Sequence, residues 1–187
     1  MDYKKAVANI RTILKEYIQK SGLKSLVVGQ SGGIDSALTS TLCALTGKKT
    51  FLVEMPIHQA KSQVNRALGH IDWLKSNFET VAMTQVNLTP VFDNLIKALP
   101  AVKDEEERFM SLANTRARLR MTTLYYFAAL QKYLVAGTGN KVEDFGVGFF
   151  TKYGDGGVDL SPIADLMKSE VYKIAAFLEI TKSIQKA

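Results

Sequence analysis

Short, mostly apolar runs alternate with longer segments of helical periodicity along this chain, and this alternation limits the folds it can adopt. The apolar runs lie at 26–28, 51–53, 81–86 and 134–136. Runs this short are typical of strands buried on both faces of a parallel sheet. Strands that alternate with helices form βαβ units. We therefore expect a single three-layer α/β domain, Rossmann-like, with a mostly parallel sheet.

Helical spacing of apolar residues predicts the other layers. The first helix is amphipathic over 6–18 and ends at Ser21-Gly22. The remaining helices are expected at 35–46, 59–77, 105–132 and 166–178, the last as the final helix of the chain. A glycine-rich loop covers 146–157, and Pro162 interrupts the chain before the last helix. The 187 residues fit one domain with its own core.

Composition narrows the possible partners. The net charge is +6, but the basic residues are dispersed apart from the cluster at 116–120, so we expect no nucleic-acid partner. No run of 18 apolar residues and no leader segment is present, so we expect no membrane partner and a cytoplasmic location. A single cysteine, Cys43, excludes an internal disulfide, and we assign it to the core.

The stretch LVVGQSGGIDSA, residues 26–37, contains more small residues than a turn needs. It joins a strand to a helix, where free backbone N–H groups and the helix dipole favour a phosphate. It matches neither GxxxxGK[ST] nor GxGxxG. Asp35 at an anion site is explained if Mg²⁺ bridges it to polyphosphate. The alternative is that residues 31–35 only cap the helix and turn the chain.

The motif SGGIDS resembles the PP-loop of the N-type ATP pyrophosphatases, which cleave ATP between its α and β phosphates. Three further stretches, TGNKVEDFGVGFFTKYGDGGVD, LANTRARLRM and LMKSEV, resemble ammonia-dependent NAD synthetases in order and spacing. This resemblance covers the chain from its first helix to its last residue. It implies an adenine nucleotide alpha hydrolase-like fold. It also implies an ammonia-dependent ligase that uses ATP and Mg²⁺ to amidate deamido-NAD to NAD.

The resemblance also assigns site residues. Asp35 and Glu143 would hold Mg²⁺, and Asp35 and Lys168 would act in catalysis. Deamido-NAD would contact Arg118, Lys152 and Asp159. ATP would be bound by a larger set: Gly29, Gln30, Ser31, Gly32, Gly33, Ile34, Asp35, Ser36, Thr138 and Lys168.

Several roles stay open at this point. Arg116 and Arg120 are four residues apart and share a helix face, whereas Arg118 points the other way, so the three cannot all serve one ligand. Asp159 could position the ribose of the nicotinic acid nucleotide or the ammonia. We expect the pair Phe149-Phe150 to fill core rather than pack a ligand ring. Trp73 is also expected in the core, and neither His58 nor His70 is assigned a catalytic role.

The implied reaction has two steps. The nicotinate carboxylate attacks the α-phosphate of ATP to give an acyl-adenylate and pyrophosphate, and ammonia then displaces AMP. The family forms homodimers, and its chains continue past the point that matches Ala187, so residues 1–187 correspond to the family domain without its C-terminal portion. Two alternatives are a nucleotide-binding module without turnover and another adenylating enzyme of the PP-loop group.

Overall fold

The computed structural model describes residues 2–101, 104–146 and 148–186. Within them, four strands form one sheet in the order β3-β2-β1-β4, and every neighbouring pair is parallel. The strands are β1 (Ser25–Gln30), β2 (Thr50–Glu54), β3 (Val81–Gln85) and β4 (Tyr133–Ala136). All four apolar runs are therefore strands, as predicted. The carboxyl ends of β1, β2 and β4 meet at one edge of the sheet, the place where ligands bind in such folds.

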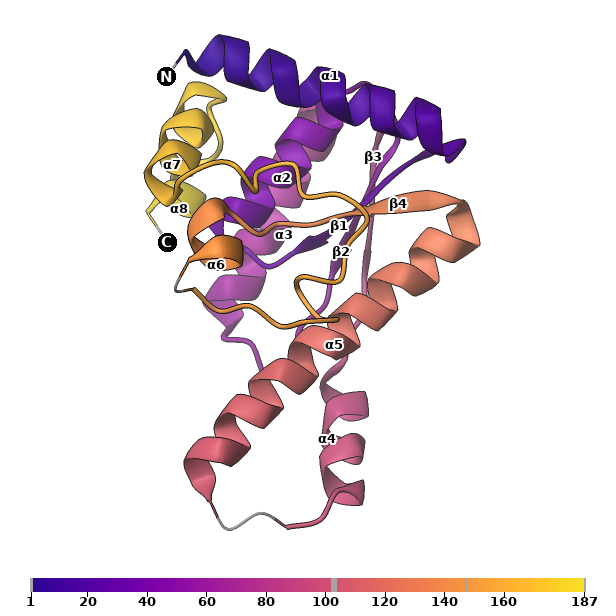
Figure 1. The fold of residues 1–187 in the computed structure, drawn as a ribbon, viewed down its shortest axis with the longest axis vertical. Coiled ribbons are helices and arrows are strands. Elements are labelled where there is room, and N and C mark those ends of the chain that lie inside the picture. The colour runs from indigo at the N-terminus through magenta and orange to yellow at the C-terminus, as the bar shows by residue number, and fades with distance from the viewer. Residues whose placement is uncertain (1, 102–103, 147, 187) are drawn as a thin grey trace.

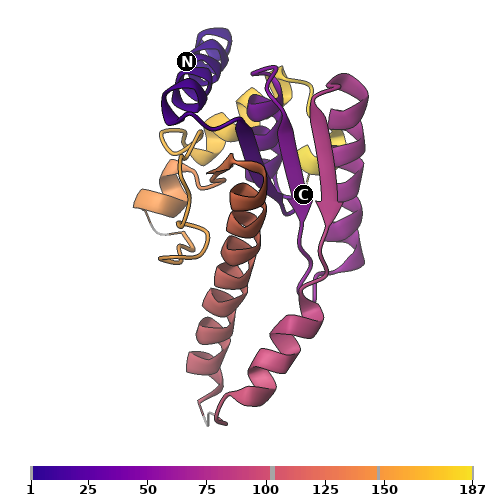
Figure 2. The same cartoon turned by 90° about the vertical axis from the view of Figure 1, so that its right-hand side faces the viewer.

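Helices cover both faces of the sheet, which confirms the three-layer α/β fold (Figure 1 and Figure 2). The helices are α1 (Tyr3–Ser21), α2 (Ile34–Ala44), α3 (Lys61–Asn77), α4 (Thr89–Ala98), α5 (Glu105–Gln131), α6 (Lys141–Phe145), α7 (Lys168–Phe177) and α8 (Lys182–Gln185). No helix in the described ranges has the length and apolar content required to cross a bilayer.

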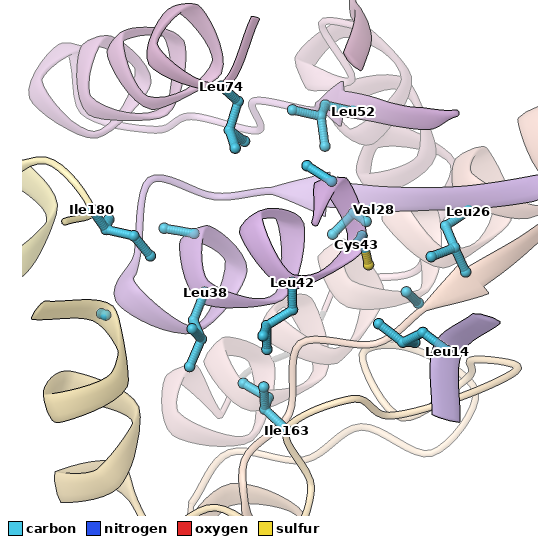
Figure 3. Close-up of a cluster of buried hydrophobic side chains, with 14 of the residues drawn as sticks. Leu14, Leu26, Val28, Leu38, Leu42, Cys43, Leu52, Leu74, Ile163 and Ile180 are labelled. Carbon is cyan, nitrogen blue, oxygen red and sulfur yellow. The ribbon is translucent and has the colours of Figure 1, made fainter. Parts of the chain in front are cut away.

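Alternate residues of the central strand face opposite layers. Leu26 and Val28 of β1 join a large buried cluster with residues of α1, α2, α3, α7 and α8, part of which is drawn in Figure 3. Val27 faces the other way and packs in a second cluster with residues of α4 and α5. This period of two is expected for a strand buried on both sides. Cys43 lies in the first cluster, fully buried as predicted, and its burial raises the pKa of the thiol.

Three helices were not expected from the sequence, and α8 shows that the helix predicted at 166–178 is not the final one. α4 has Pro90 in its first turn, a position that proline tolerates. α6 and α8 are five and four residues long, too short to show helical periodicity. α4 and the N-terminal part of α5 extend together beyond the sheet (Figure 1 and Figure 2).

Candidate functional site

The loop between β1 and α2 is held in shape by glycine and serine. Gly32 has a φ of 79°, and a Cβ at this position would lie 2.5 Å from the backbone oxygen of Gln63. Gly33 begins α2 in an extended conformation, and no side chain caps the helix there. The Ser31 hydroxyl accepts a hydrogen bond from the Gly33 N–H at 3.2 Å and lies 3.0 Å from the Ser36 hydroxyl. The first N–H groups of α2 are thus not used by a side-chain cap, contrary to the capping alternative.

Other loop residues predicted to bind ATP have different surroundings. Ile34 is buried in the core. Gln30 is also buried, and its amide donates to the Ser40 hydroxyl at 3.3 Å. Gly29 and Thr138 lie at the ends of β1 and β4, where they line a cavity. Apart from Lys168, the residues predicted to bind ATP therefore come from the segments at the ends of two neighbouring strands, β1 and β4.

Three charged side chains from separate segments meet beside this loop. Asp35 comes from the first turn of α2, Glu143 from α6, and Lys168 from the first residue of α7. The Lys168 ammonium donates to Oδ2 of Asp35 and, at 3.2 Å, to Oε1 of Glu143. The structure thus brings together both residues predicted to hold Mg²⁺ and the lysine predicted to contact phosphate.

The carboxylates keep Lys168 charged. Burial by itself lowers the pKa of this lysine, but the hydrogen bonds and charges of Asp35 and Glu143 outweigh it, and the pKa of Lys168 rises. A lysine at a helix N-terminus also meets the positive end of the helix dipole. The two carboxylates counteract both effects, the burial of the charged lysine and its place at the positive end of the helix dipole.

Asn140 belongs to this cluster, although no role was predicted for it from the sequence. Its side chain is fully buried, and its amide nitrogen donates to Oδ1 of Asp35 at 2.8 Å. Its oxygen accepts from the N–H groups of Val142 and Glu143, at 3.0 and 3.3 Å, and so caps α6. Asparagine is a common N-cap residue, and its place ahead of Glu143 was the available signal.

A cavity of about 220 Å³ opens beside the loop at the carboxyl edge of the sheet. Its walls come from β1, β2, β4, α5 and the glycine-rich loop, and it is lined by Gly29, Gln30, Ser31, Glu54, Met55, Gln59, Ala117, Arg120, Met121, Leu124, Ala136, Gly137, Thr138, Phe149, Gly154, Asp155 and Val158. A mostly apolar wall with a few polar groups is typical of a site for a ring-bearing ligand.

Glu54 and Arg120 are two of the charged residues in the cavity wall, with Asp155 the third. Burial raises the pKa of Glu54, while the Gln85 hydrogen bond and the charge of Arg120 oppose the rise. Arg120 donates to the backbone oxygen of Met55 at 3.1 Å and to Gln59 at 3.0 Å. Sequence reasoning assigned no role to these residues, although Glu54 ends a strand at the edge where ligands bind.

Two of the three residues predicted to contact deamido-NAD lie together. Nε and Nη2 of Arg118 are each 3.4 Å from the backbone oxygen of Lys152. Asp159 is held elsewhere. Its Oδ1 accepts from the Tyr125 hydroxyl at 3.0 Å, and its Oδ2 accepts from the N–H of Val135 at 2.7 Å.

The three arginines at 116, 118 and 120 of α5 separate as their spacing predicts. Arg116 lies 4.7 Å above the ring of Phe92, and Arg120 faces the loop after β2. Arg118 instead faces the glycine-rich loop, of which the structure describes residue 146 and residues 148–157. One helix therefore presents arginines to two different regions.

The expectation for the two phenylalanines of the glycine-rich loop was wrong. Phe149 and Phe150 are 47% and 48% exposed, because this loop lies on the surface and not between the layers. Phe150 packs on Gly156, where a Cβ would lie 2.2 Å from its ring. Phe149 lines the cavity. Trp73 is only partly buried against the core and stacks on His70.

Comparison with known proteins identifies the family to which the chain belongs. The NAD synthase family model matches residues 6–187. The chain belongs to the NAD synthase family. NH(3)-dependent NAD(+) synthetase of Pyrobaculum aerophilum is 37% identical over 97% of this chain and 67% of its own length. That of Carboxydothermus hydrogenoformans is 39% identical over 91% of this chain and 68% of its own. These relatives are ligases, and this NAD synthase family member is an enzyme of that class.

Solved structures agree with this assignment. NMN synthetase from Francisella tularensis superposes with a TM-score of 0.91 at 27% identity, covering 100% of this chain and 75% of that one. NH3-dependent NAD synthetase from Campylobacter jejuni, in complex with the nitrate ion, gives 0.89 at 33% identity, covering 100% and 77%. Both chains extend beyond the part matched by this NAD synthase family member.

Proposed function

We propose that this chain amidates deamido-NAD to NAD with ammonia, at the expense of ATP. The observation that supports this most directly is the convergence of Asp35, Glu143 and Lys168 beside the glycine loop. The named activity of the relatives and the matched family point the same way. A binding module without turnover is the alternative, and the test below separates it from the ligase.

In the proposed reaction, the nicotinate carboxylate of deamido-NAD attacks the α-phosphate of ATP. The bond from the α-phosphorus to the bridging oxygen breaks, and pyrophosphate leaves with that electron pair. Ammonia then attacks the carbonyl carbon of the acyl-adenylate, loses a proton and expels AMP. Adenylation is needed because a carboxylate oxygen is a poor leaving group. The protein contributes chiefly by positioning and by stabilising charge.

Each part of the site has a role in this scheme. The N–H groups at the start of α2 and the hydroxyls of Ser31 and Ser36 bind phosphate oxygens. Lys168 places a positive charge where pyrophosphate leaves. The cavity beside Thr138 and Glu54 accepts the adenine ring. Arg118, Lys152 and Asp159 bind deamido-NAD, and Asp159 also holds its segment against β4.

The residues fit Mg²⁺. Asp35 and Glu143 already converge on one cationic atom, Nζ of Lys168, and carboxylate oxygens are the ligands this metal prefers. The described residues hold no group of three or more histidine, cysteine or acidic side chains that could enclose a metal, so phosphate oxygens and water would complete the coordination. A bound Mg²⁺ would neutralise polyphosphate charge.

We further propose that two copies associate through α4 and α5. Both helices expose several large apolar side chains, which is unusual for a monomer surface. These residues are Val91, Leu95, Leu99, Phe109, Met110, Tyr126 and Leu130. A cytoplasmic location without membrane or nucleic-acid partners stays a prediction.

The test mixes the protein with ATP, Mg²⁺, ammonium and deamido-NAD and follows NAD and AMP together. Equal formation of both supports the ligase reaction. AMP without NAD would mean that adenylation occurs but amide formation fails. ATP binding with neither product would favour the binding module. Nicotinic acid mononucleotide belongs in a parallel reaction, because a relative of 27% identity is an NMN synthetase.

A further inference from the structure

We propose that Asn140 is a positioning residue that holds Asp35 and Glu143 in a fixed relation to each other. This inference rests on the proposed function, since it concerns the two carboxylates of the ATP site. Asn140 touches neither substrate nor reacting atoms in this scheme. It acts through the two acids, one of which it bonds directly and the other of which it places by capping the helix that bears it.

The two halves of the Asn140 amide serve different elements. The nitrogen donates to Oδ1 of Asp35 on α2 at 2.8 Å. The oxygen caps α6 through the N–H groups of Val142 and Glu143. The orientation of the amide is fixed by this arrangement, because only the oxygen can accept from the helix N–H groups. The NH₂ group must then face Asp35.

The two oxygens of Asp35 have different partners. Asn140 bonds Oδ1, while Lys168 bonds Oδ2. The side chain of Asp35 is 15% exposed, so few rotamers remain open to it. A second hydrogen bond connects the same segment to the chain just before α7. The N–H of Lys141 donates to the backbone oxygen of Leu166 at 3.0 Å, two residues before Lys168. The segment 140–141 therefore has hydrogen bonds to the elements that carry all three charged groups.

Chemistry explains why asparagine is suited to this position. Serine and aspartate cap helices about as well as asparagine does. Serine is too short to reach Asp35, and aspartate would face it with a second negative charge. Only a side chain with an acceptor and a donor on one rigid plane meets both demands. Groups that orient ligating carboxylates typically change metal affinity or activity by about 10- to 100-fold when replaced.

The test compares Asn140→Ser and Asn140→Asp with the unaltered protein. Both variants keep the helix cap and lose the donor to Asp35. We expect both to unfold within a few degrees of the unaltered protein, to lose about tenfold or more in kcat and to keep KM for deamido-NAD within about threefold. The matched control is Asp2→Ser, which changes the N-cap of α1, where Asp2 accepts from the N–H of Lys5 at 3.0 Å.

One readout separates positioning from a structural role. Calorimetry with a non-hydrolysable ATP analogue should show weaker binding in the presence of Mg²⁺ and unchanged binding without it. The calorimetric result does not require turnover, so an inactive parent protein would contradict the proposed function without deciding this inference.

Retention of the parent kcat and of Mg²⁺-dependent nucleotide binding in both variants would overturn the proposal and leave Asn140 as a helix cap. Unfolding of both variants, with Asp2→Ser folded, would also overturn it, because the contact would then maintain the fold. Folded variants with impaired Mg²⁺-dependent binding support it.

Discussion

At the site, the positive charge of the Lys168 ammonium group is balanced by the carboxylates of Asp35 and Glu143. Asp35 and Glu143 offset both the burial of Lys168 and its place at the positive end of α7. The balance has a direct consequence for phosphate binding, because the same ammonium can turn toward a more negative ligand. A change at any one of the three residues should therefore alter ligand binding more than folding.

We predict that Asp35→Asn reduces ATP turnover by about a hundredfold or more and leaves the fold intact, because one of two metal-binding carboxylates loses its charge. Release of AMP measures the loss, and circular dichroism checks the fold. The matched control is Asp93→Asn, which removes an exposed carboxylate 2.7 Å from His58. Normal turnover in Asp35→Asn would remove Asp35 from the metal site.

The roles of single residues could be predicted only in part from the sequence. The resemblance assigned Asp35, Glu143 and Lys168, and the structure brings these three together. Asn140 was not assigned, because its importance depends on a contact with a residue far away in the chain. The phenylalanines at 149 and 150 were misjudged because composition does not show whether a glycine-rich loop lies inside or outside the layers.

Elements impose their own constraints on the site. The β1–α2 loop passes so close to α3 that no side chain fits at Gly32. The packing of α2 against α3 also buries His70, whose Nε2 lies 3.2 Å from the Ser40 hydroxyl. Both features link the nucleotide loop to the helix behind it, and each can be tested by folding measurements.

Gly32→Ala should destabilise the protein by at least about 2 kcal/mol more than Gly47→Ala. Both glycines have a positive φ, 79° and 71°, so both substitutions carry the same backbone strain. A Cβ at Gly47 meets nothing within 4 Å, whereas one at Gly32 collides with the backbone of α3. Urea unfolding of the two variants measures the difference, and equal losses would show that the collision is relieved at no cost.

Acid should destabilise the chain through His70. Burial lowers the pKa of His70 from 6.5 to about 4, although a hydrogen bond with the backbone of Ala37 opposes the shift. Between these values the unfolded chain binds a proton that the folded protein excludes. The free energy of unfolding therefore falls as pH drops below 6.5, and the whole loss has occurred by about pH 4. The loss is on the order of 3 kcal/mol.

The measurement compares unfolding at pH 7 and pH 5 in the unaltered protein and in His70→Gln. Glutamine does not titrate, so the variant should lose less stability between the two pH values. His58→Gln is the control, since His58 is half exposed. An identical pH slope in the parent protein and in His70→Gln would exclude His70 as the source.

Element prediction succeeded for the four strands and five helices, and failed for α4, α6 and α8. The predicted elements were located to within a few residues, because burial imposes periods of two and 3.6. α6 was missed because a five-residue helix is defined by its cap. The order of the strands in the sheet could not be predicted from the sequence, because it depends on how the helices that connect the strands pack against the sheet.

At the scale of the whole molecule, α4 and α5 expose the apolar side chains through which we propose that two copies associate. We predict a dimer in analytical ultracentrifugation, and we predict that Phe109→Lys combined with Leu130→Lys yields monomers, because both side chains are 66% exposed and apolar. Ile13→Lys is the control, an equally apolar residue, 61% exposed on α1. A parent protein that sediments as a monomer at every concentration would contradict the prediction.

The order in which the site residues occur along the chain also bears on biosynthesis. β1, β2 and β3 follow one another in both sequence and space, so a nascent polypeptide can pair them as soon as they leave the ribosome. β4 must then return to the free edge of β1, and Lys168 emerges later still. Until it does, the partly buried Asp35 lacks the ammonium group that pairs with it. The nucleotide site is therefore completed only after most of the sheet that supports it has formed.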